Sequence, residues 1–267
     1  MKNNDSTLFK GAAWYYSHFR RGYPPAFFDH IIKSFNLNHN SRVLDLGTGT
    51  GQIAIPLAKN IKEVVAVDPD QEMLEEGKNQ AKKEKVENIA WTQATAEDFS
   101  DSLGPFNVTT MGTSFHWMKQ DEVLKKIYNI TEKDGGIVIV SNTTSIYRNQ
   151  KNDEWKNIVR SIIEKYLGEK RRAGKAYFKE PQDRFEDIIK RSDFSDFTTF
   201  TEVYMQEWTI DQILGFLSST SFAARRLFGE HIQGFENDLR AELLRLDSLG
   251  VFNEEVTLEA FLAWKRS

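Results

Sequence analysis

Short apolar runs alternate with stretches of helical periodicity through the first half of the chain. The apolar runs, which predict β-strands, span residues 43–46, 64–67, 89–93, 106–111 and 137–141. Between them, apolar residues recur every three or four positions, and this spacing predicts helices over residues 27–35, 51–60, 71–82 and 121–130. Unbroken apolar strands separated by helices are typical of a parallel sheet covered on both faces. The pattern therefore predicts an α/β fold with a doubly wound sheet.

The pattern changes after Asn142. Alternation predicts further strands over residues 197–208 and 256–264, and helical spacing predicts helices over residues 152–166, 211–219 and 236–246. We expect the two strands to complete a mostly parallel, seven-stranded sheet. We expect residues 145–195 and 210–250 to pack over the strand ends as a helical substrate lid.

This organisation divides the chain into three predicted units. They are an N-terminal helical cap (1–40), a ligand-binding core (41–142), and the remainder of the sheet with its lid (143–267). Open parallel sheets bind ligands outside the carboxyl ends of their strands. The candidate binding residues are therefore expected at one edge of the sheet.

Three glycines at alternate positions, Gly47, Gly49 and Gly51, end the first predicted strand shortly after Asp45. Glycine lets the backbone turn sharply and approach a ligand closely, and the helix start that follows offers unpaired N–H groups. The spacing is G-x-G-x-G, whereas the dinucleotide fingerprint G-x-G-x-x-G would need glycine at Gln52. This difference counts against a nicotinamide-dependent oxidoreductase. The other interpretation is an ordinary tight turn without a ligand.

Asp68 ends the second predicted strand, 17 positions after Gly51. A carboxylate at this place can accept hydrogen bonds from both hydroxyls of a ribose, as the downstream acid does in dinucleotide-binding folds. Alternatively, Asp68 caps the helix that begins at Asp70–Gln71. The glycine loop upstream favours ribose binding.

Composition narrows the classes of partner. The 267 residues carry a net charge of −4 and include no cysteine, which excludes disulfides, thiolate metal sites and a cysteine nucleophile. The charge balance lacks the basic footprint of a nucleic-acid binder, and no apolar run is long enough to cross a membrane. The five histidines show no metal-binding spacing, and residues 1–10 are polar, unlike a signal peptide. We expect a cytoplasmic protein without a metal ion and without membrane or nucleic-acid partners.

Three motifs together resemble class I S-adenosylmethionine-dependent methyltransferases. They are Asp45-x-Gly47-x-Gly49-x-Gly51, Val65-Ala66-Val67-Asp68-Pro69 and Ala96-Glu97-Asp98-Phe99. Two further pieces are similar to the methyltransferase type 11 branch, near trans-aconitate methyltransferase-like proteins: Tyr16-x-x-x-Arg20-x-x-Tyr23-Pro24 and Phe115-His116-Trp117-Met118. The resemblance covers residues 14–142 and implies a Rossmann-like methyltransferase fold. It also implies S-adenosyl-L-methionine as cofactor and S-adenosyl-L-homocysteine as product.

The resemblance implies which residues hold the cofactor. The glycines would pass against its methionine portion and ribose, Asp68 would bind the ribose, and the loop after the third strand would bind the adenine. The expected cofactor-binding residues are Tyr16, Arg20, Asp45, Gly47, Thr48, Gly49, Gly51, Gln52, Asp68, Pro69, Met73, Thr95, Ala96, Glu97, Gly112, Thr113 and Ser114.

Two of these assignments leave alternatives open. Thr95 stands where family members often carry Asp, so it can accept one hydrogen bond but brings no charge. Arg20 lies four positions after Tyr16, on the same face of a helix, and suits a bidentate grip on the methionine carboxylate. A solvated surface arginine is the other interpretation, and Arg21 is a rival for the same role.

Phe115, His116 and Trp117 follow the fourth predicted strand, where a methyl acceptor would sit, so they are the expected substrate-pocket residues. Methyl transfer depends mainly on alignment and exclusion of water, and a base is needed only when the acceptor arrives protonated. His116 is the candidate catalytic base, and a purely structural role is its alternative. The cluster Lys170-Arg171-Arg172, with Lys175, would attract an anionic substrate or form a solvated loop.

What the loop after the fourth strand lacks restricts the chemistry. It carries no [Asp/Asn]-Pro-Pro-aromatic motif of base-amine methylation, and no Asp within residues 108–119 to hold magnesium. We therefore predict a metal-independent methyltransferase of a small organic molecule, with O-methylation of a carboxylate or hydroxyl. The alternatives are an RNA or protein methyltransferase and a non-catalytic S-adenosylmethionine-binding module.

Overall fold

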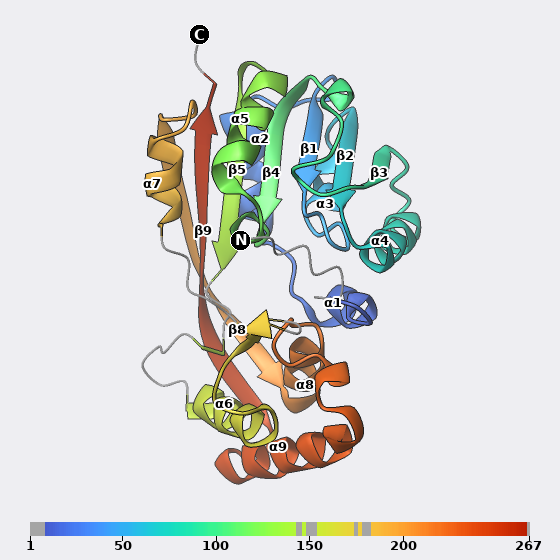
Figure 1. The fold of residues 1–267 in the computed structure, drawn as a ribbon, viewed down its shortest axis with the longest axis vertical. Helices are drawn as coiled ribbons and strands as arrows, with labels where there is room; N and C mark the ends of the chain where they lie inside the picture. Colours follow the sequence, from blue (N-terminus) through green and yellow to red (C-terminus); the bar gives the residue numbers. More distant parts are fainter. Residues whose placement is uncertain (1–8, 143–145, 148–153, 174–175, 178–182, 266–267) are drawn as a thin grey trace.

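One seven-stranded sheet organises the chain, with helices on both faces (Figure 1). The computed structural model describes residues 9–142, 146–147, 154–173, 176–177 and 183–265. The strands of this sheet are β1 (Arg42–Leu46), β2 (Glu63–Asp68), β3 (Ile89–Gln93), β4 (Phe106–Gly112), β5 (Thr131–Asn142), β8 (Phe197–Thr209) and β9 (Val251–Trp264). Their order is β3-β2-β1-β4-β5-β9-β8, and β9 runs antiparallel to both of its neighbours. The predicted doubly wound, mostly parallel, seven-stranded sheet is confirmed.

Alternate residues of the central strands enter two separate hydrophobic layers. Leu44 and Ile139 belong to the layer that includes α5 (Gln120–Ile130) and α7 (Phe185–Lys190). Val43 and Val140 belong to the opposite layer, beneath α2 (Pro25–Ser34) and α3 (Ala54–Ala58). Both faces are buried because parallel sheets are covered by their crossover helices, which is why apolar residues occupy consecutive positions in these strands and not only alternate ones.

Strand β5 is longer than the sequence predicts. Residues 133–136, which precede the predicted strand over 137–141, lie within β5, where Asp134 has a φ of +62° and the register with β4 shifts between Phe106 and Val108. Gly136 lies within β5 and lets β9 approach closely, because an added Cβ at this position would meet the backbone oxygen of Ala263 in β9 at 2.1 Å. Glycine in a strand marks such a close backbone approach as well as a turn, and the sequence signal is the same for both.

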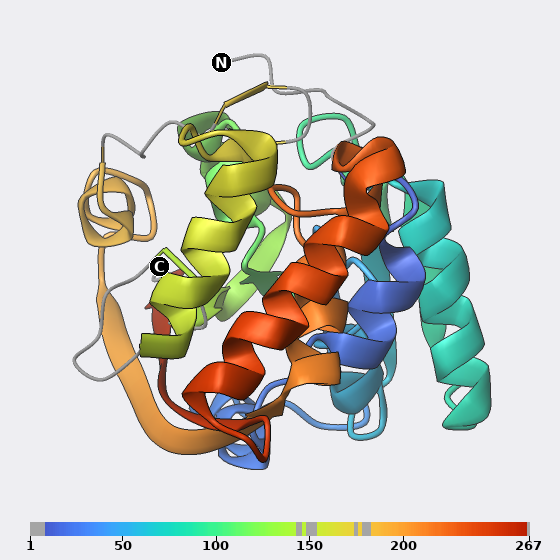
Figure 2. The same cartoon turned by 90° about the horizontal axis from the view of Figure 1, so that it is seen from below.

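A second helical layer lies beyond the carboxyl ends of β1, β2 and β4 (Figures 1 and 2). It contains α6 (Glu154–Leu167), α8 (Ile210–Ser218) and α9 (Ile232–Leu246), whose apolar faces form one cluster with Trp208 of β8 and Phe252 of β9. Within it, Lys156 Nζ and Glu254 Oε1 form a buried ion pair at 2.7 Å. The Trp208 indole donates to the other Glu254 oxygen at 2.8 Å. Residues at the end of β8 and the start of β9 thus anchor the layer of α6, α8 and α9.

Helix α7 occupies a different place. Its Ile188 and Ile189 pack against the sheet with Phe115 and Phe261 in the layer of α5. The expectation that all of residues 145–195 pack over the strand ends is wrong for this helix, because its apolar pair is buried on the sheet face instead. Residues 152–153 of the predicted helix and Lys175 of the basic cluster lie outside the described residues.

Helix α1 (Ala13–Phe19) contacts both the sheet part of the protein and the layer of α6, α8 and α9. Phe19 packs onto α8 at Gly215, where an added Cβ would meet the Phe19 ring at 2.2 Å. On its other side, α1 contacts α4 (Gln71–Lys83) through Ala12, Ala13 and Met73. Among the described helices, none is long and apolar enough to span a bilayer.

Candidate functional site

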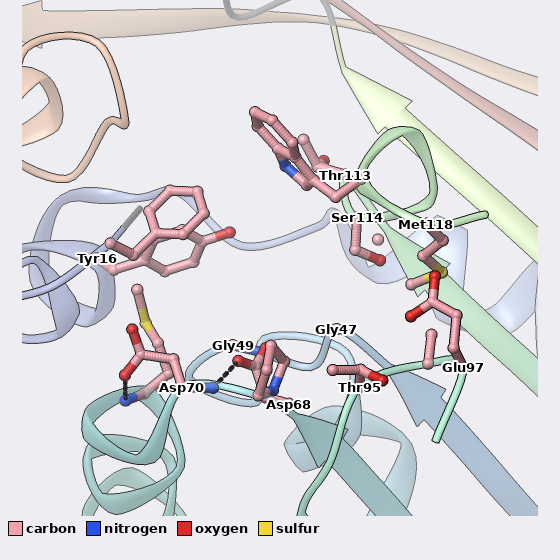
Figure 3. Close-up of a pocket in the computed structure, with 16 residues that line it drawn as sticks. Tyr16, Gly47, Gly49, Asp68, Asp70, Thr95, Glu97, Thr113, Ser114 and Met118 are labelled. Atoms are coloured by element: carbon pink, nitrogen blue, oxygen red, sulfur yellow. Dashed lines mark hydrogen bonds between the residues drawn. The ribbon is translucent and has the colours of Figure 1, made fainter. Parts of the chain in front are cut away.

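A cavity of about 160 Å³ opens at the carboxyl ends of β1, β2 and β4, beneath α1. Figure 3 shows Tyr16 on one side of this space and Glu97 and Met118 on the opposite side. Its lining residues are Phe9, Tyr16, Gly47, Gly49, Asp68, Pro69, Asp70, Met73, Thr95, Ala96, Glu97, Gly112, Thr113, Ser114, Trp117 and Met118. Segments far apart in the sequence thus meet at the sheet edge where parallel sheets bind their ligands.

The three glycines of the first loop all have positive φ, of +65°, +55° and +82° for Gly47, Gly49 and Gly51. Gly49 lines the cavity, and the nearest atom to an added Cβ there is in the Tyr16 ring, at 3.7 Å. A side chain at Gly49 would therefore stand in the cavity itself. Gly51 differs, because an added Cβ would meet Trp91 at 2.8 Å. Its role is to let the loop pack against β3, and it does not line the cavity.

Asp68 faces the cavity from the end of β2 and is tied to the glycine loop (Figure 3). Its carboxylate accepts hydrogen bonds from the N–H groups of Gly49 at 2.8 Å and Asp70 at 2.9 Å. The N-cap of α4 is Asp70, which accepts from the Glu72 N–H at 2.9 Å. Burial raises the pKa of Asp68 to about 6, against the effect of these hydrogen bonds. Asp70 therefore caps α4, and Asp68, which does not cap this helix, lines the cavity.

Asp45, Thr48 and Gln52 line a smaller cavity that adjoins the first behind the glycine loop. The Asp45 carboxylate accepts hydrogen bonds at 2.6 Å from the hydroxyls of Thr48 and Thr110. Burial raises the pKa of Asp45 to about 6. Asp45 thus connects the glycine loop, through Thr48, with β4, through Thr110.

Tyr16 and Arg20 take different positions at the cavity. Tyr16 lines it, whereas Arg20 follows the last residue of α1 and is not among its lining residues. The Arg20 guanidinium lies 4.9 Å from the ring centres of both Tyr16 and Phe216, and its Nε donates to Ser219 Oγ at 2.9 Å. Arg21 points elsewhere, since it donates to the backbone oxygen of Glu207 in β8. Of the two arginines, Arg20 is the one beside the cavity.

The loop after β3 lines the far side of the cavity, with Met73 of α4 buried at its margin. The Thr95 hydroxyl donates to Asp98 Oδ2 at 2.8 Å, which closes a local turn. Glu97 Oε1 accepts from the Lys119 N–H at 2.8 Å. These side chains are therefore positioned by the protein's own hydrogen bonds.

The three residues that follow Ser114 after β4 have different surroundings. Trp117 lines the cavity, but Phe115 is 1% exposed and packs edge-on against Phe185 of α7, at 5.5 Å between ring centres. The expectation of Phe115 in the substrate pocket is corrected, because the 3₁₀ turn over Phe115–Trp117 directs its ring into the core. His116 is half-buried beside Trp117 and is not among the lining residues. Its burial, and then the positive charge of Arg171, lower its pKa to about 4.

Three lining residues, Phe9, Asp70 and Met118, are absent from the sequence-based expectation. Asp70 carried a signal, because an acid directly before a helix is a typical N-cap and also borders the preceding strand end. Met118 ends the motif Phe115-His116-Trp117-Met118 but was not assigned to the site, and Phe9 precedes the first motif and offered no local signal.

Comparison with known proteins identifies the same region. Residues 43–135 match the family described as "Methyltransferase domain". An uncharacterized methyltransferase of Schizosaccharomyces pombe is 29% identical over 124 residues, which are 46% of this chain and 47% of that protein. The uncharacterized methyltransferase YcgJ of Bacillus subtilis is 27% identical over 41% of this chain and 44% of its own length. The 23S rRNA uracil C5-methyltransferase RlmD of Aliivibrio fischeri is 38% identical over 26% of this chain and 16% of its own length.

The fold is shared over a longer stretch than the sequence. The crystal structure of YcgJ superposes with a TM-score of 0.53 at 18% identity, covering 90% of this chain and 98% of that one. In sequence, however, this chain matches about half the length of the first two curated relatives or less. The comparisons thus establish the Rossmann-like methyltransferase fold and a methyltransferase domain match in its first half.

Proposed function

We propose that the protein is an S-adenosyl-L-methionine-dependent methyltransferase of a small organic molecule, acting without a metal ion. The observation that carries this proposal is the joining of Gly49 and Asp68 at one cavity by a hydrogen bond of 2.8 Å. The methyltransferase domain match to residues 43–135 supports the choice of ligand.

The residues that line the cavity suit the parts of the adenosyl cofactor. Gly49 leaves open the space that a side chain would fill, and the Asp68 carboxylate can accept hydrogen bonds from ribose hydroxyls. Met73 and the loop at Thr95–Glu97 would border the adenine, and Arg20 would lie near the methionine carboxylate. When bound, the cofactor supplies an activated methyl group for attack by an acceptor nucleophile.

We further propose that the acceptor lies between Trp117 and the lid that α6, α8 and α9 form. There the residues' main task is to align the acceptor and exclude water. His116 is neutral at physiological pH, since its pKa is lowered to about 4, so it can accept a hydrogen bond that orients a hydroxyl acceptor, while the same low pKa makes it a weak base. A carboxylate acceptor would need no base, so O-methylation of a carboxylate or hydroxyl fits this site.

Methylation of RNA is the second candidate, favoured by the match to RlmD. That match covers 16% of RlmD, and the present chain has no cysteine for thiol-assisted C5 chemistry. Its net charge of −4 also gives no electrostatic attraction to phosphates. Retention on tRNA at physiological salt would favour this candidate over a small-molecule acceptor.

Isothermal titration tests the proposed function. We expect saturable binding of S-adenosylhomocysteine with one site per chain and no binding of NADH under the same conditions. Absence of detectable binding at millimolar S-adenosylhomocysteine would contradict the proposal. Binding without turnover of any acceptor would instead indicate a non-catalytic S-adenosylmethionine-binding module.

A further inference from the structure

Arg171 lies in an aromatic frame on the lid, outside the cofactor cavity. Its guanidinium carbon is 4.7 Å from the ring centre of Tyr147 and 5.2 Å from that of Phe222, and the two rings meet edge to face at 5.1 Å. Arg160 of α6 lies 5.8 Å from the same Tyr147 ring centre and donates to the backbone oxygen of Ile146 at 3.0 Å. Stacking on aromatic faces restricts a guanidinium to one orientation, which prepares it for a planar partner.

Two observations place this frame next to the proposed acceptor side. The charge of Arg171 acts directly on His116, which adjoins the cavity-lining Trp117. Phe222 lies three residues after Ser219, and Ser219 accepts the hydrogen bond of Arg20 beside Tyr16. Residues 219–222 therefore connect the cofactor cavity with the Arg171 frame.

The chain trace agrees with this placement. Arg171 directly precedes the hairpin of β6 (Arg172–Ala173) and β7 (Ala176–Tyr177). Figure 1 shows that hairpin in yellow, between the sheet and the lid helices. Arg171 is half-buried, and its burial lowers its pKa. A half-buried charge at this place interacts more strongly with an opposite charge than a solvated surface arginine does.

We propose that Arg171 binds an anionic group of the methyl acceptor, so that the acceptor is a small organic anion, a carboxylate or a phosphate monoester. This inference rests on the proposed function and names the substrate class of the same site. The fork of N–H groups of arginine matches either anion in a bidentate geometry, and the rings of Tyr147 and Phe222 offer apolar surface to the rest of the molecule. Arg171 contacts both rings of this frame, whereas Arg160 contacts Tyr147 and donates to the Ile146 backbone oxygen, so we assign the selection for the anion to Arg171.

The rival explanation is that Arg171 has only a structural role and stabilises the lid by packing against Tyr147 and Phe222. Both explanations predict some loss of stability when Arg171 is replaced, so stability alone does not separate them. They differ in what they predict for ligand charge, because a purely structural arginine is indifferent to whether an added small molecule is an acid or its amide.

Titration of matched probes separates the two. Protein saturated with S-adenosylhomocysteine is titrated with benzoate, cinnamate, succinate and phenyl phosphate, and with their neutral counterparts benzamide, cinnamamide, succinamide and phenol. The variants are Arg171→Gln, Arg171→Lys and, as the matched control, Lys170→Gln. Lys170 is the neighbouring exposed residue, and its replacement removes the same charge.

We expect at least one acid to bind and its neutral counterpart to bind at least tenfold more weakly. Arg171→Gln should remove this preference, Arg171→Lys should retain part of it, and Lys170→Gln should leave it unchanged. The carboxylate and phosphate arms tell which anion is recognised. If no acid binds, if amides bind equally well, or if Arg171→Gln behaves like Lys170→Gln, the inference is wrong. Failure of S-adenosylhomocysteine itself to bind would instead remove the proposed function.

Discussion

The Asp68 carboxylate accepts a hydrogen bond from the Gly49 N–H at 2.8 Å, which ties the end of β2 to the loop that follows β1. The parallel register that pairs Leu46 with Val67 brings the two strand ends level. The same carboxylate faces the cavity, so one side chain both fixes the glycine loop and presents acceptor oxygens to a ligand. We take this bond as the centre of the proposed cofactor site.

Replacing Asp68 with Asn should weaken binding of S-adenosylhomocysteine about 10- to 100-fold, as expected for a hydrogen bond to a charged group. The amide oxygen can still accept the Gly49 N–H and so keep the loop tied to β2, while the amide nitrogen no longer accepts from the Asp70 N–H. Asp70→Asn is the control, because it removes a charge beside the same cavity while Asn still caps α4. Calorimetry should show a clearly smaller loss for the control. Equal losses would mean that net charge, and not the ribose contact, sets the affinity.

Affinity for S-adenosylhomocysteine should also fall as the pH is lowered through about 6. Burial raises the pKa of Asp68 to this value. Above this pKa the carboxylate is charged and accepts the ribose hydrogen bonds, and below it protonation removes one acceptor. Asp45 titrates in the same range, which makes Asp45→Asn the informative control. The pH dependence should persist in Asp45→Asn and vanish in Asp68→Asn. The opposite assignment would move the ribose contact away from Asp68.

Gly49→Val should abolish cofactor binding, because φ at Gly49 is +55° and the added side chain would stand in the cavity. The strain of this conformation alone costs on the order of 1–2 kcal/mol. Gly229 has the same φ of +55° with no atom within 4 Å of an added Cβ, so Gly229→Val reports the strain alone. Thermal unfolding should show a comparable destabilisation of both variants, and titration should show lost binding only for Gly49→Val. Normal affinity in Gly49→Val would refute the assigned site.

The pH dependence of stability should carry a contribution from His116. In the unfolded chain its imidazole binds a proton below about pH 6.5, whereas in the folded protein the lowered pKa keeps it neutral down to about 4. The stabilisation that the neutral, buried imidazole gives to the folded state is therefore present above pH 6.5 and is lost as the pH falls toward 4. The free energies of unfolding of the wild type and His116→Gln should converge as the pH falls from about 7 to about 4.5. Replacement of exposed His231 controls for loss of an imidazole, and a constant difference for His116→Gln would contradict its assigned burial.

The sheet and the strand-end motifs could be predicted because their signals are local. Short, mainly apolar strands separated by helices indicate the parallel sheet, and the sheet rule then places Gly47, Gly49 and Asp68 at the same edge. The capping alternative for Asp68 was resolved only by the side-chain contacts, since both aspartates precede the same helix. The sequence thus predicts which residues lie at a strand end, but it does not predict which of two neighbouring aspartates caps the helix and which one faces the cavity.

Long-range packing set the limit of the sequence prediction. Arg20 and Ser219 are 199 positions apart, so nothing local indicates that the lid contacts the helix beside the cavity. Phe115 was expected in the pocket because it follows the fourth strand, where a methyl acceptor would sit, but its ring is buried in the core against Phe185 of α7. The α7 position itself depends on the apolar face of β9, which is completed only late in the chain.

A crystal structure of the protein grown with saturating S-adenosylhomocysteine tests the central claim most directly. We predict density for the whole ligand in the cavity beneath α1, with both ribose hydroxyls within hydrogen-bonding distance of the Asp68 carboxylate and the homocysteine portion along Gly47 and Gly49. Density elsewhere on the protein, or a cavity that stays empty at saturation, would contradict the account.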